Sequence, residues 1–267
     1  MGCCNSGPRL PSEEVLLGKI RYSIESNNAE RLSSYSIIHE NIANCSVTLF
    51  SDMPIIKIKS ISLSCLGYSL WLGHQKVFRF LYEKNCSGVV AMEEHFNSQN
   101  TSGIDILMQR KYSEFLSYYL PIYLSNYSKI KKTQKSPFTI HNVIESANIT
   151  LLSVIVEGLK DKAEIPKELD VHAINEETGD NGALVACRAC NLTILKYLIQ
   201  HFKLNFRQKN KEGKGVINVI IESKADKATK LCCLEMVLNV EKIEIPDSYP
   251  EFDEDFQKIL HKLKVVE

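Results

Sequence analysis

Apolar residues near the middle of the C-terminal half recur at the spacing of an α-helix. They follow the i, i+3, i+4, i+7 pattern, which places apolar side chains on one helix face. These residues are Leu192, Ile194, Leu195, Leu198 and Ile199. A shorter apolar segment ends at Ala186-Cys187, and a polar segment with several lysines follows the periodic one. The pattern predicts two helices joined by a tight turn at Cys190-Asn191 and followed by a loop.

The segment from Asn181 to Gly215 resembles the ankyrin repeat, whose core reads roughly TPLHLAAxxGHxxVVxxLL and precedes a loop of the DVNAKDxDG type. Ala186-Cys187 stands where the family has its Ala-Ala pair, and Cys190-Asn191 replaces the Gly-His turn. Asn205 and Glu212-Gly213 match the loop. The resemblance implies an all-α solenoid of stacked helix pairs, whose loop tips and first helices bind other proteins without catalysis.

The same register places further copies along the chain. Trp71-Leu72-Gly73-His74 keeps the Gly-His dipeptide, and His141 matches the histidine of TPLH. We expect about six helix-turn-helix units, starting near Gly18, Ser64, Ser102, Phe138, Asn181 and Gly215. The complete TPLH motif occurs nowhere, so the array is a degenerate ankyrin-like solenoid.

Loop insertions must lengthen some of these repeats. The intervals between the expected starts run from 34 residues (181 to 215) to 46 residues (18 to 64), whereas ankyrin repeats recur about every 33 residues. Asn44 to Lys59 has the pattern of an extended hairpin, with Val-Thr-Leu-Phe and Ile-Ile-Lys-Ile runs as its strands. Ser125 to Ser136 and Lys160 to Glu176 are polar loops.

The sequence divides into three parts. Residues 1–12 form a leader, residues 13–246 the repeat domain, and residues 247–267 a helix that caps the last repeat. In that helix acidic residues precede basic ones, which complements the helix dipole. One stripe is apolar and closes the array as a terminal cap must: Phe256, Ile259, Leu260 and Leu263. Another mainly helical fold is the alternative.

Composition is that of an ordinary folded domain, with 44% hydrophobic and 24% charged residues. Lys+Arg and Asp+Glu are both 32, so the formal charge is zero. This balance argues against a nucleic-acid partner, which normally requires a basic excess or a basic face.

The best candidate for a spanning helix, Pro54 to Leu72, contains Lys57 and Lys59. We therefore expect no membrane-spanning segment.

The first six residues, MGCCNS, predict lipid attachment. Gly2 and Ser6 fit the pattern for N-myristoylation, and Cys3 and Cys4 would accept palmitate at the bilayer. One myristoyl chain binds membranes only marginally, with a constant of about 10⁴ M⁻¹, so stable anchoring takes a second signal. No basic patch follows in the sequence, so palmitate on the two cysteines must supply the second signal. We expect lipidation at Gly2, Cys3 and Cys4 and a place on the cytoplasmic face of a membrane.

Candidate chemistry is limited to cysteines. Cys187, Cys190, Cys232 and Cys233 could hold zinc or act as a thiol site, which gives a metalloprotein or enzyme as the alternative function. Adjacent cysteines on a helix point about 100° apart, which suits a single tetrahedral site poorly. We expect no metal, no cofactor and no catalytic residues. The favoured interpretation is a membrane-tethered adaptor that binds an unidentified protein.

Overall fold

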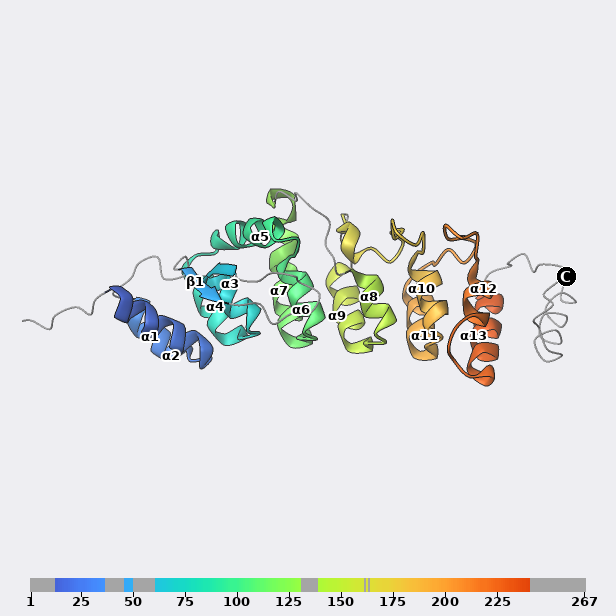
Figure 1. Cartoon of the computed structure of the whole chain (residues 1–267), viewed down its shortest axis with the longest axis horizontal. Coiled ribbons are helices and arrows are strands. Elements are labelled where there is room, and N and C mark those ends of the chain that lie inside the picture. The colour runs from blue at the N-terminus through green and yellow to red at the C-terminus, as the bar shows by residue number, and fades with distance from the viewer. Residues whose placement is uncertain are drawn as a thin grey trace, which may run out of the picture. The chain divides into compact units, whose positions relative to one another are not determined.

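The computed structural model describes residues 13–36, 46–49, 61–130, 139–160, 162 and 164–240. The chain divides into two compact parts, Met1–Pro137 and Phe138–Glu267. In their described residues, both are built from pairs of antiparallel helices, with one short β-ribbon in the N-terminal part (Figure 1). The predicted helical-repeat architecture is therefore confirmed.

The described residues of the N-terminal part form three helix pairs, a two-stranded ribbon and one additional helix. The pairs are α1 (Glu13–Glu25) with α2 (Ala29–Ser36), α3 (Cys65–Trp71) with α4 (Gln75–Lys84), and α6 (Gly103–Gln109) with α7 (Ser113–Asn126). The ribbon is β1 (Ser46–Leu49) and β2 (Ile61–Ser64), the additional helix is α5 (Gly88–Ser98), and η2 (Tyr127–Lys129) follows α7.

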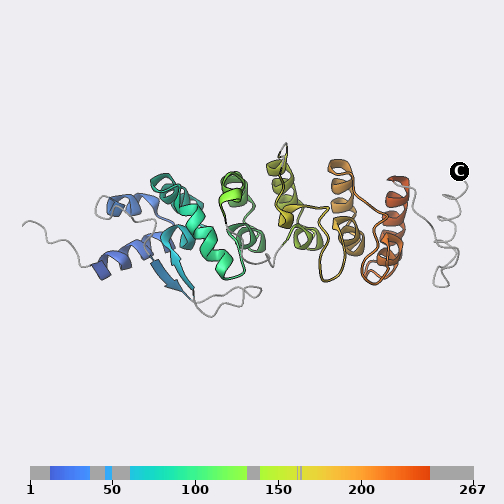
Figure 2. The same ribbon diagram turned by 90° about the horizontal axis from the view of Figure 1, so that it is seen from above.

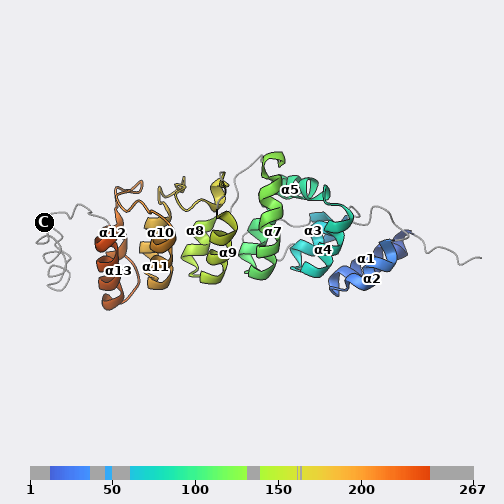
Figure 3. The same cartoon turned by 180° about the vertical axis from the view of Figure 1, so that it is seen from behind.

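Between residues 139 and 240, the C-terminal part forms three more pairs. These are α8 (Ile140–Glu145) with α9 (Ile149–Leu159), α10 (Gly182–Ala189) with α11 (Leu192–His201), and α12 (Val216–Ile221) with α13 (Lys227–Val240). The 3-10 turn η3 (Lys167–Leu169) lies between α9 and α10. First helices pack on first helices and second helices on second helices, because α10 contacts α8 and α12 while α11 contacts α9 and α13. The view from behind shows these three pairs side by side (Figure 3).

Local capping decides where the helices begin. Ser64, Ser102 and Asn181 precede first helices, and each side-chain oxygen accepts a hydrogen bond from the backbone N–H three residues later at 3.0–3.1 Å. Asn148 and Asn191 do the same for second helices, both at 3.0 Å. A capped N–H is no longer an orphan donor, which is why these residue types are preferred at this position. Asn191 therefore opens the second helix directly after the turn that was predicted at Cys190-Asn191.

A left-handed residue closes the turn inside five of the helix pairs that the structure describes. These residues are Asn27, Gly73, Lys111, Ala147 and Cys190, with φ between 46° and 75°. In the first four, the next N–H bonds to the carbonyl five residues back, which is the Schellman arrangement. The sixth pair lacks this turn, and Asp226 instead accepts from the Thr229 N–H at 3.0 Å.

The predicted repeat starts agree closely with the observed pairs. Five first helices begin one or two residues after the predicted starts at 64, 102, 138, 181 and 215. The exception is α1, which begins at Glu13 rather than near Gly18, so this helix is longer than the repeat requires. Of the apolar stripe on α11, Ile194, Leu195 and Leu198 are fully buried, while Leu192 and Ile199 are partly exposed.

The hairpin expected between Asn44 and Lys59 is half right. Val47 to Leu49 form a strand as predicted, but its partner is Ile61–Ser64, and not the Ile55–Ile58 run. The two strands pair antiparallel, with Ser46 opposite Ser64 and Leu49 opposite Ile61. Strand pairing depends on which apolar run can also pack on the body, and β2 leads directly into α3 and contacts it.

Helix α5 was not predicted, because the unit from Ser64 to Ser102 was expected to hold one helix pair with its extra residues in loops. It contacts α3, α7 and β2, and Figure 2 shows it running across this part of the molecule. Val89, Met92 and Phe96 are its buried apolar residues, at the i, i+3, i+7 spacing of one helix face. The signal was therefore present in the sequence.

Two predicted features lie outside the described residues. These are the leader, residues 1–12, and the C-terminal capping helix, residues 247–267. Within the described ranges, no helix combines the length and hydropathy needed to cross a membrane.

Candidate functional site

Two polar loops of the C-terminal part leave the same end of their helix pairs (Figure 1). The first loop, residues 164–181, joins α9 to α10, and the second loop, residues 202–215, joins α11 to α12. They have opposite charge. The first loop carries six acidic residues and one basic residue, whereas the second carries five basic residues and one acidic residue.

Both loops are folded around an asparagine at equivalent positions. Asn175 Oδ1 accepts from the N–H groups of Glu177 and Thr178, at 2.8 and 3.2 Å. Asn210 Oδ1 accepts from the N–H groups of Glu212 and Lys214, at 3.0 and 2.9 Å. Asn side chains stabilise turns by such bonds to nearby backbone. The two loops are therefore copies of one local structure.

The loops also bind each other through backbone groups. The Lys211 N–H donates to the Thr178 carbonyl at 3.0 Å, and the Lys211 ammonium donates to the Glu176 carbonyl. Gly179 has φ of 80°, and a Cβ there would lie 2.6 Å from the Lys211 nitrogen. Only glycine permits both this backbone conformation and this approach. The contact between the loops thus depends on a small residue at one position.

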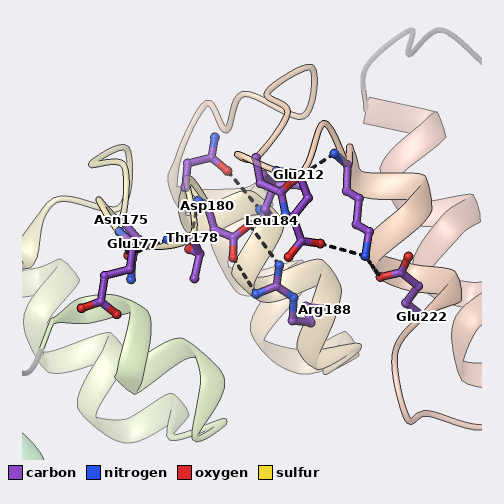
Figure 4. A network of polar contacts seen from close by, with 11 residues as sticks. Asn175, Glu177, Thr178, Asp180, Leu184, Arg188, Glu212 and Glu222 are labelled. Atoms are coloured by element: carbon purple, nitrogen blue, oxygen red, sulfur yellow. Dashed lines mark hydrogen bonds and ion pairs between the residues drawn. The ribbon is translucent and has the colours of Figure 1, made fainter.

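Side chains from the helices hold the bases of the loops (Figure 4). Arg188 on α10 makes a two-pronged ion pair with Asp180, at 2.5 and 3.0 Å. Asp180 is 1% exposed and the Arg188 side chain 42% exposed. Asn181 caps α10 with its oxygen while its Nδ2 donates to the Asn205 carbonyl of the second loop at 3.0 Å. Paired groups of this kind fix an otherwise mobile backbone.

Lys214 connects the second loop to α12. Its ammonium lies 2.9 Å from a Glu212 carboxylate oxygen and 2.8 Å from one of Glu222. The hydrogen bond from Lys214 lowers the pKa of Glu212, and the two carboxylates raise the pKa of Lys214. These groups are solvent-exposed, so their pairing orients the loop more than it stabilises the fold.

The loops expose groups suited to binding. Ile174 is 48% exposed at the tip of the first loop, and Lys203 and Lys209 are exposed on the second. The His172 and Phe202 rings meet edge to face across the two loops, with centroids 6.1 Å apart. The result is a surface that exposes acidic side chains on the first loop, basic side chains on the second loop and one large apolar side chain.

In the N-terminal part, α5 stands between the second and third helix pairs. Its Glu93 is fully buried and accepts hydrogen bonds from the Gly103 N–H, at 2.9 and 3.2 Å, and from the Tyr119 hydroxyl. Burial and the Glu93 carboxylate raise the pKa of Tyr119. Glu93 thus joins α5, α6 and α7.

The four cysteines proposed as an alternative metal or thiol site do not all converge. Cys187, Cys190 and Cys233 are buried together, but Cys232 is exposed. The two adjacent cysteines therefore face different environments, as helix geometry requires. Across the described ranges, no group of three or more histidine, cysteine or acidic side chains is placed to hold a metal ion.

Two histidines predicted at repeat positions bind backbone. His74 Nδ1 lies 2.6 Å from the Ile24 carbonyl of the preceding helix pair. His141 is hydrogen-bonded to the backbone of Val171, while its burial lowers the ring pKa. Both rings therefore have a structural role through their contacts with backbone groups.

No protein-family model matches the sequence, and none of the curated proteins matches it. Among solved structures, EF0377, an ankyrin repeat protein, matches over 77% of this chain and 91% of its own length, with 12% sequence identity and a TM-score of 0.51. The chain has the ankyrin-repeat fold. The human ASB11 ankyrin repeat domain matches over 86% of this chain and 99% of its own, with 13% identity and a TM-score of 0.45.

The sequence analysis missed that the first loop has the loop motif of the ankyrin repeat. The stretch from Lys160 to Glu176 was assigned to an insertion, yet Asp170-Val171-His172-Ala173 and Asn175 begin a loop of the family's DVNA type. Aligning it with the second loop, from Asn205 to Asn210, would have found the equivalent asparagines. Gly2, Cys3 and Cys4 lie outside the described residues.

Proposed function

We propose that this chain is a non-catalytic protein–protein interaction module whose two loops, residues 164–181 and 202–215, form the binding surface. The observation that carries the proposal is the direct bonding between the loops, by which Lys211 joins the Thr178 and Glu176 carbonyls. Loops held in this way lose little conformational entropy on binding, so more of the contact energy appears as affinity.

The charge distribution indicates the chemistry of the partner. A protein that presents acidic side chains to the second loop and basic side chains to the first would have a complementary potential. Complementary charges speed association and fix the orientation of a complex more than they raise its affinity. Ile174 and the His172–Phe202 ring pair supply apolar contact area beside the charges.

The binding surface can be tested by charge reversal on the full chain. A biotin ligase fused to the C-terminus would label neighbours of the wild type and of a Lys203→Glu/Lys209→Glu variant. The matched control is Lys196→Glu, an exposed lysine of α11 that lies outside both loops. We expect specific neighbours to be lost only with the loop variant. Equal labelling by all three chains would exclude the second loop as the binding site.

We propose further that lipids on Gly2, Cys3 and Cys4 hold the module on the cytoplasmic face of a membrane. The support is the MGCCNS sequence, with Met1 taken as the initiating residue. Because one myristoyl chain binds only marginally, the adjacent cysteines are needed for stable attachment. Confinement to a surface would raise the effective concentration of a partner on the same membrane.

Cell fractionation tests the anchor. A Gly2→Ala variant should become soluble, and a Cys3→Ser/Cys4→Ser variant should bind membranes weakly and reversibly. Cys86→Ser is the control, because Cys86 is exposed but belongs to the helical body. Unchanged membrane association of the first two variants would remove the lipid proposal and leave the interaction proposal standing.

A further inference from the structure

Four charged side chains on the two loops of the C-terminal part have no ion-pair partner among the residues that the structure describes. Glu164 and Glu177 are exposed on the first loop, and Lys203 and Lys209 are exposed on the second. In Figure 4, the Glu177 carboxylate points away from the network of contacts that holds the bases of the loops. These four side chains are therefore available to a partner.

Other charged side chains of the loops serve the chain itself. The Lys167 ammonium lies 2.9 Å from a Glu176 carboxylate oxygen within the first loop. On the second loop, Lys214 pairs with Glu212 and Glu222, at 2.9 and 2.8 Å. These internal pairs leave a negative charge on the first loop and a positive charge on the second.

The first loop also exposes two apolar side chains. Ile165 is 40% exposed and Ile174 is 48% exposed, and they are two of the five large apolar side chains that are exposed in the described ranges. The ion pair of Lys167 with Glu176 joins the two segments that carry them. Apolar side chains with charged groups around them are typical of a protein interface, in which a polar rim surrounds an apolar centre.

We propose that a second copy of this chain binds this surface, related to the first copy by a two-fold axis that runs between the two loops and along them. The inference rests on the proposed binding surface and names the protein that occupies it. A half-turn about this axis places the first loop of each copy opposite the second loop of the other. Glu164 and Glu177 then face Lys203 and Lys209 twice, because every contact of a two-fold interface occurs in both directions.

The charges select this orientation. A two-fold axis that crosses the loops at a right angle would place each loop opposite its own copy, so that acidic side chains meet acidic ones and basic meet basic. Like charges brought together disfavour such an arrangement. A different protein would need an acidic and a basic segment side by side in the matching order, and this chain already presents both.

The size of the surface sets the expected strength of the dimer. The first loop has 18 residues and the second has 14, whereas a stable interface takes about 20–30 residues from each side. Both loops must therefore take part, and we expect a reversible dimer. Salt screens the interaction between exposed charges, so the dimer should dissociate as the ionic strength rises.

Analytical ultracentrifugation of the purified full-length chain, over a range of protein and salt concentrations, tests the proposal. A reducing agent is present, so that the exposed Cys86 and Cys232 cannot link two copies through a disulfide. The expected result is a monomer–dimer equilibrium that weakens with salt. A chain that stays monomeric at low salt and high concentration would overturn the proposal. The proximity labelling of the Lys203→Glu/Lys209→Glu variant would then still decide whether the loops bind another protein.

Complementary charge reversals test the orientation. Lys203→Glu/Lys209→Glu and Glu164→Lys/Glu177→Lys should each weaken self-association by about tenfold or more, because like charges then meet on both sides of the axis. An equal mixture of the two variants should form a heterodimer, since every reversed side chain faces an opposite charge again. Its recovery also shows that both variants are folded. A mixture that stays monomeric, or a single variant that dimerises as tightly as the wild type, would contradict the proposed orientation.

The matched control is Lys196→Glu/Lys224→Glu, which changes the net charge by the same amount as the variant of the second loop. Both lysines are exposed and lie outside the two loops, so this variant should dimerise like the wild type. Ile174→Ser should weaken the dimer at low and at high salt, because it removes apolar contact area and no charge. Loss of the dimer in the control variant would show that net charge governs association, and it would overturn the assignment to the loops.

Discussion

Replacement of Gly103 by alanine tests the contact that joins α5 to the helix pairs. Gly103 is the first residue of α6, and its N–H donates to both oxygens of the buried Glu93 carboxylate. An added Cβ would lie 2.5 Å from Glu93 Oε1, 2.9 Å from a ring carbon of Tyr119 and 3.0 Å from a methyl of Leu70. An ordinary carbon–oxygen contact is about 3.3 Å or longer. The carboxylate must therefore move by most of an ångström.

The expected cost combines two effects. Overpacking of a buried site costs about 1–3 kcal/mol, and a weakened hydrogen bond to a charged group costs about 1.5–3 kcal/mol. The helix-forming advantage of alanine over glycine recovers about 0.5–1 kcal/mol. We therefore expect Gly103→Ala to lower the free energy of unfolding by about 2–5 kcal/mol, a large part of the stability of a typical domain.

Urea unfolding followed by circular dichroism measures this change, and hydrogen exchange locates it on α5 and α6. The control is Gly18→Ala, because Gly18 is an exposed residue of α1 with no atom within 4 Å of its added Cβ. That variant should gain about 0.5–1 kcal/mol. The double variant Glu93→Ala/Gly103→Ala should lose less free energy of unfolding than the two single variants together, since alanine at position 93 makes room for the added Cβ. Wild-type stability of Gly103→Ala, or strict additivity, would refute the contact.

Three further predictions concern the C-terminal part. Arg188→Ala should lower the free energy of unfolding by about 3 kcal/mol, because it leaves the buried Asp180 carboxylate unpaired. Asp180→Ala should lower it by less, since the half-exposed Arg188 guanidinium can turn to water. Equal losses in urea unfolding would contradict this. Burial lowers the pKa of His141 in the folded state, so the unfolded state binds its proton first and stability should fall as pH drops below about 6.5. Thermal unfolding across this range should show the fall, and His141→Asn should reduce it. Asn191→Ala should cost about 1 kcal/mol by loss of a helix cap, with the exposed Thr193→Ala as a near-neutral control; similar Tm values for both would argue against capping.

Sequence patterns worked best where the structure is set by near neighbours. A turn was expected at Cys190-Asn191, and Asn191 opens the following helix by accepting a hydrogen bond from the N–H three residues later. The apolar stripe of α11 was found by its spacing. These features depend on residues within one or two helical turns of each other, so a short stretch of sequence contains the information.

The ribbon and helix α5 show where local patterns were insufficient. The sequence suggested Ile55–Ile58 as the second strand, whereas β1 pairs with Ile61–Ser64, which also contacts α3. In α5, the spacing of Val89, Met92 and Phe96 was visible in the sequence, but the expectation of one helix pair per repeat included no additional helix. A repeat pattern predicts the usual length of a unit, but it does not predict the secondary structure of an insertion.

The helix-pair repeat, its turns and its caps were determined by the sequence itself, because hydrogen bonds across three to five residues decide them. Only the tertiary structure decided that Glu93 meets Tyr119 across 26 positions and that Cys190 meets Ser223 across 33 positions. It also brought the acidic and basic loops into direct contact through Lys211 and Thr178. Those contacts depend on the path of the chain between distant residues, since stacking of helix pairs brings together side chains that no short-range pattern relates.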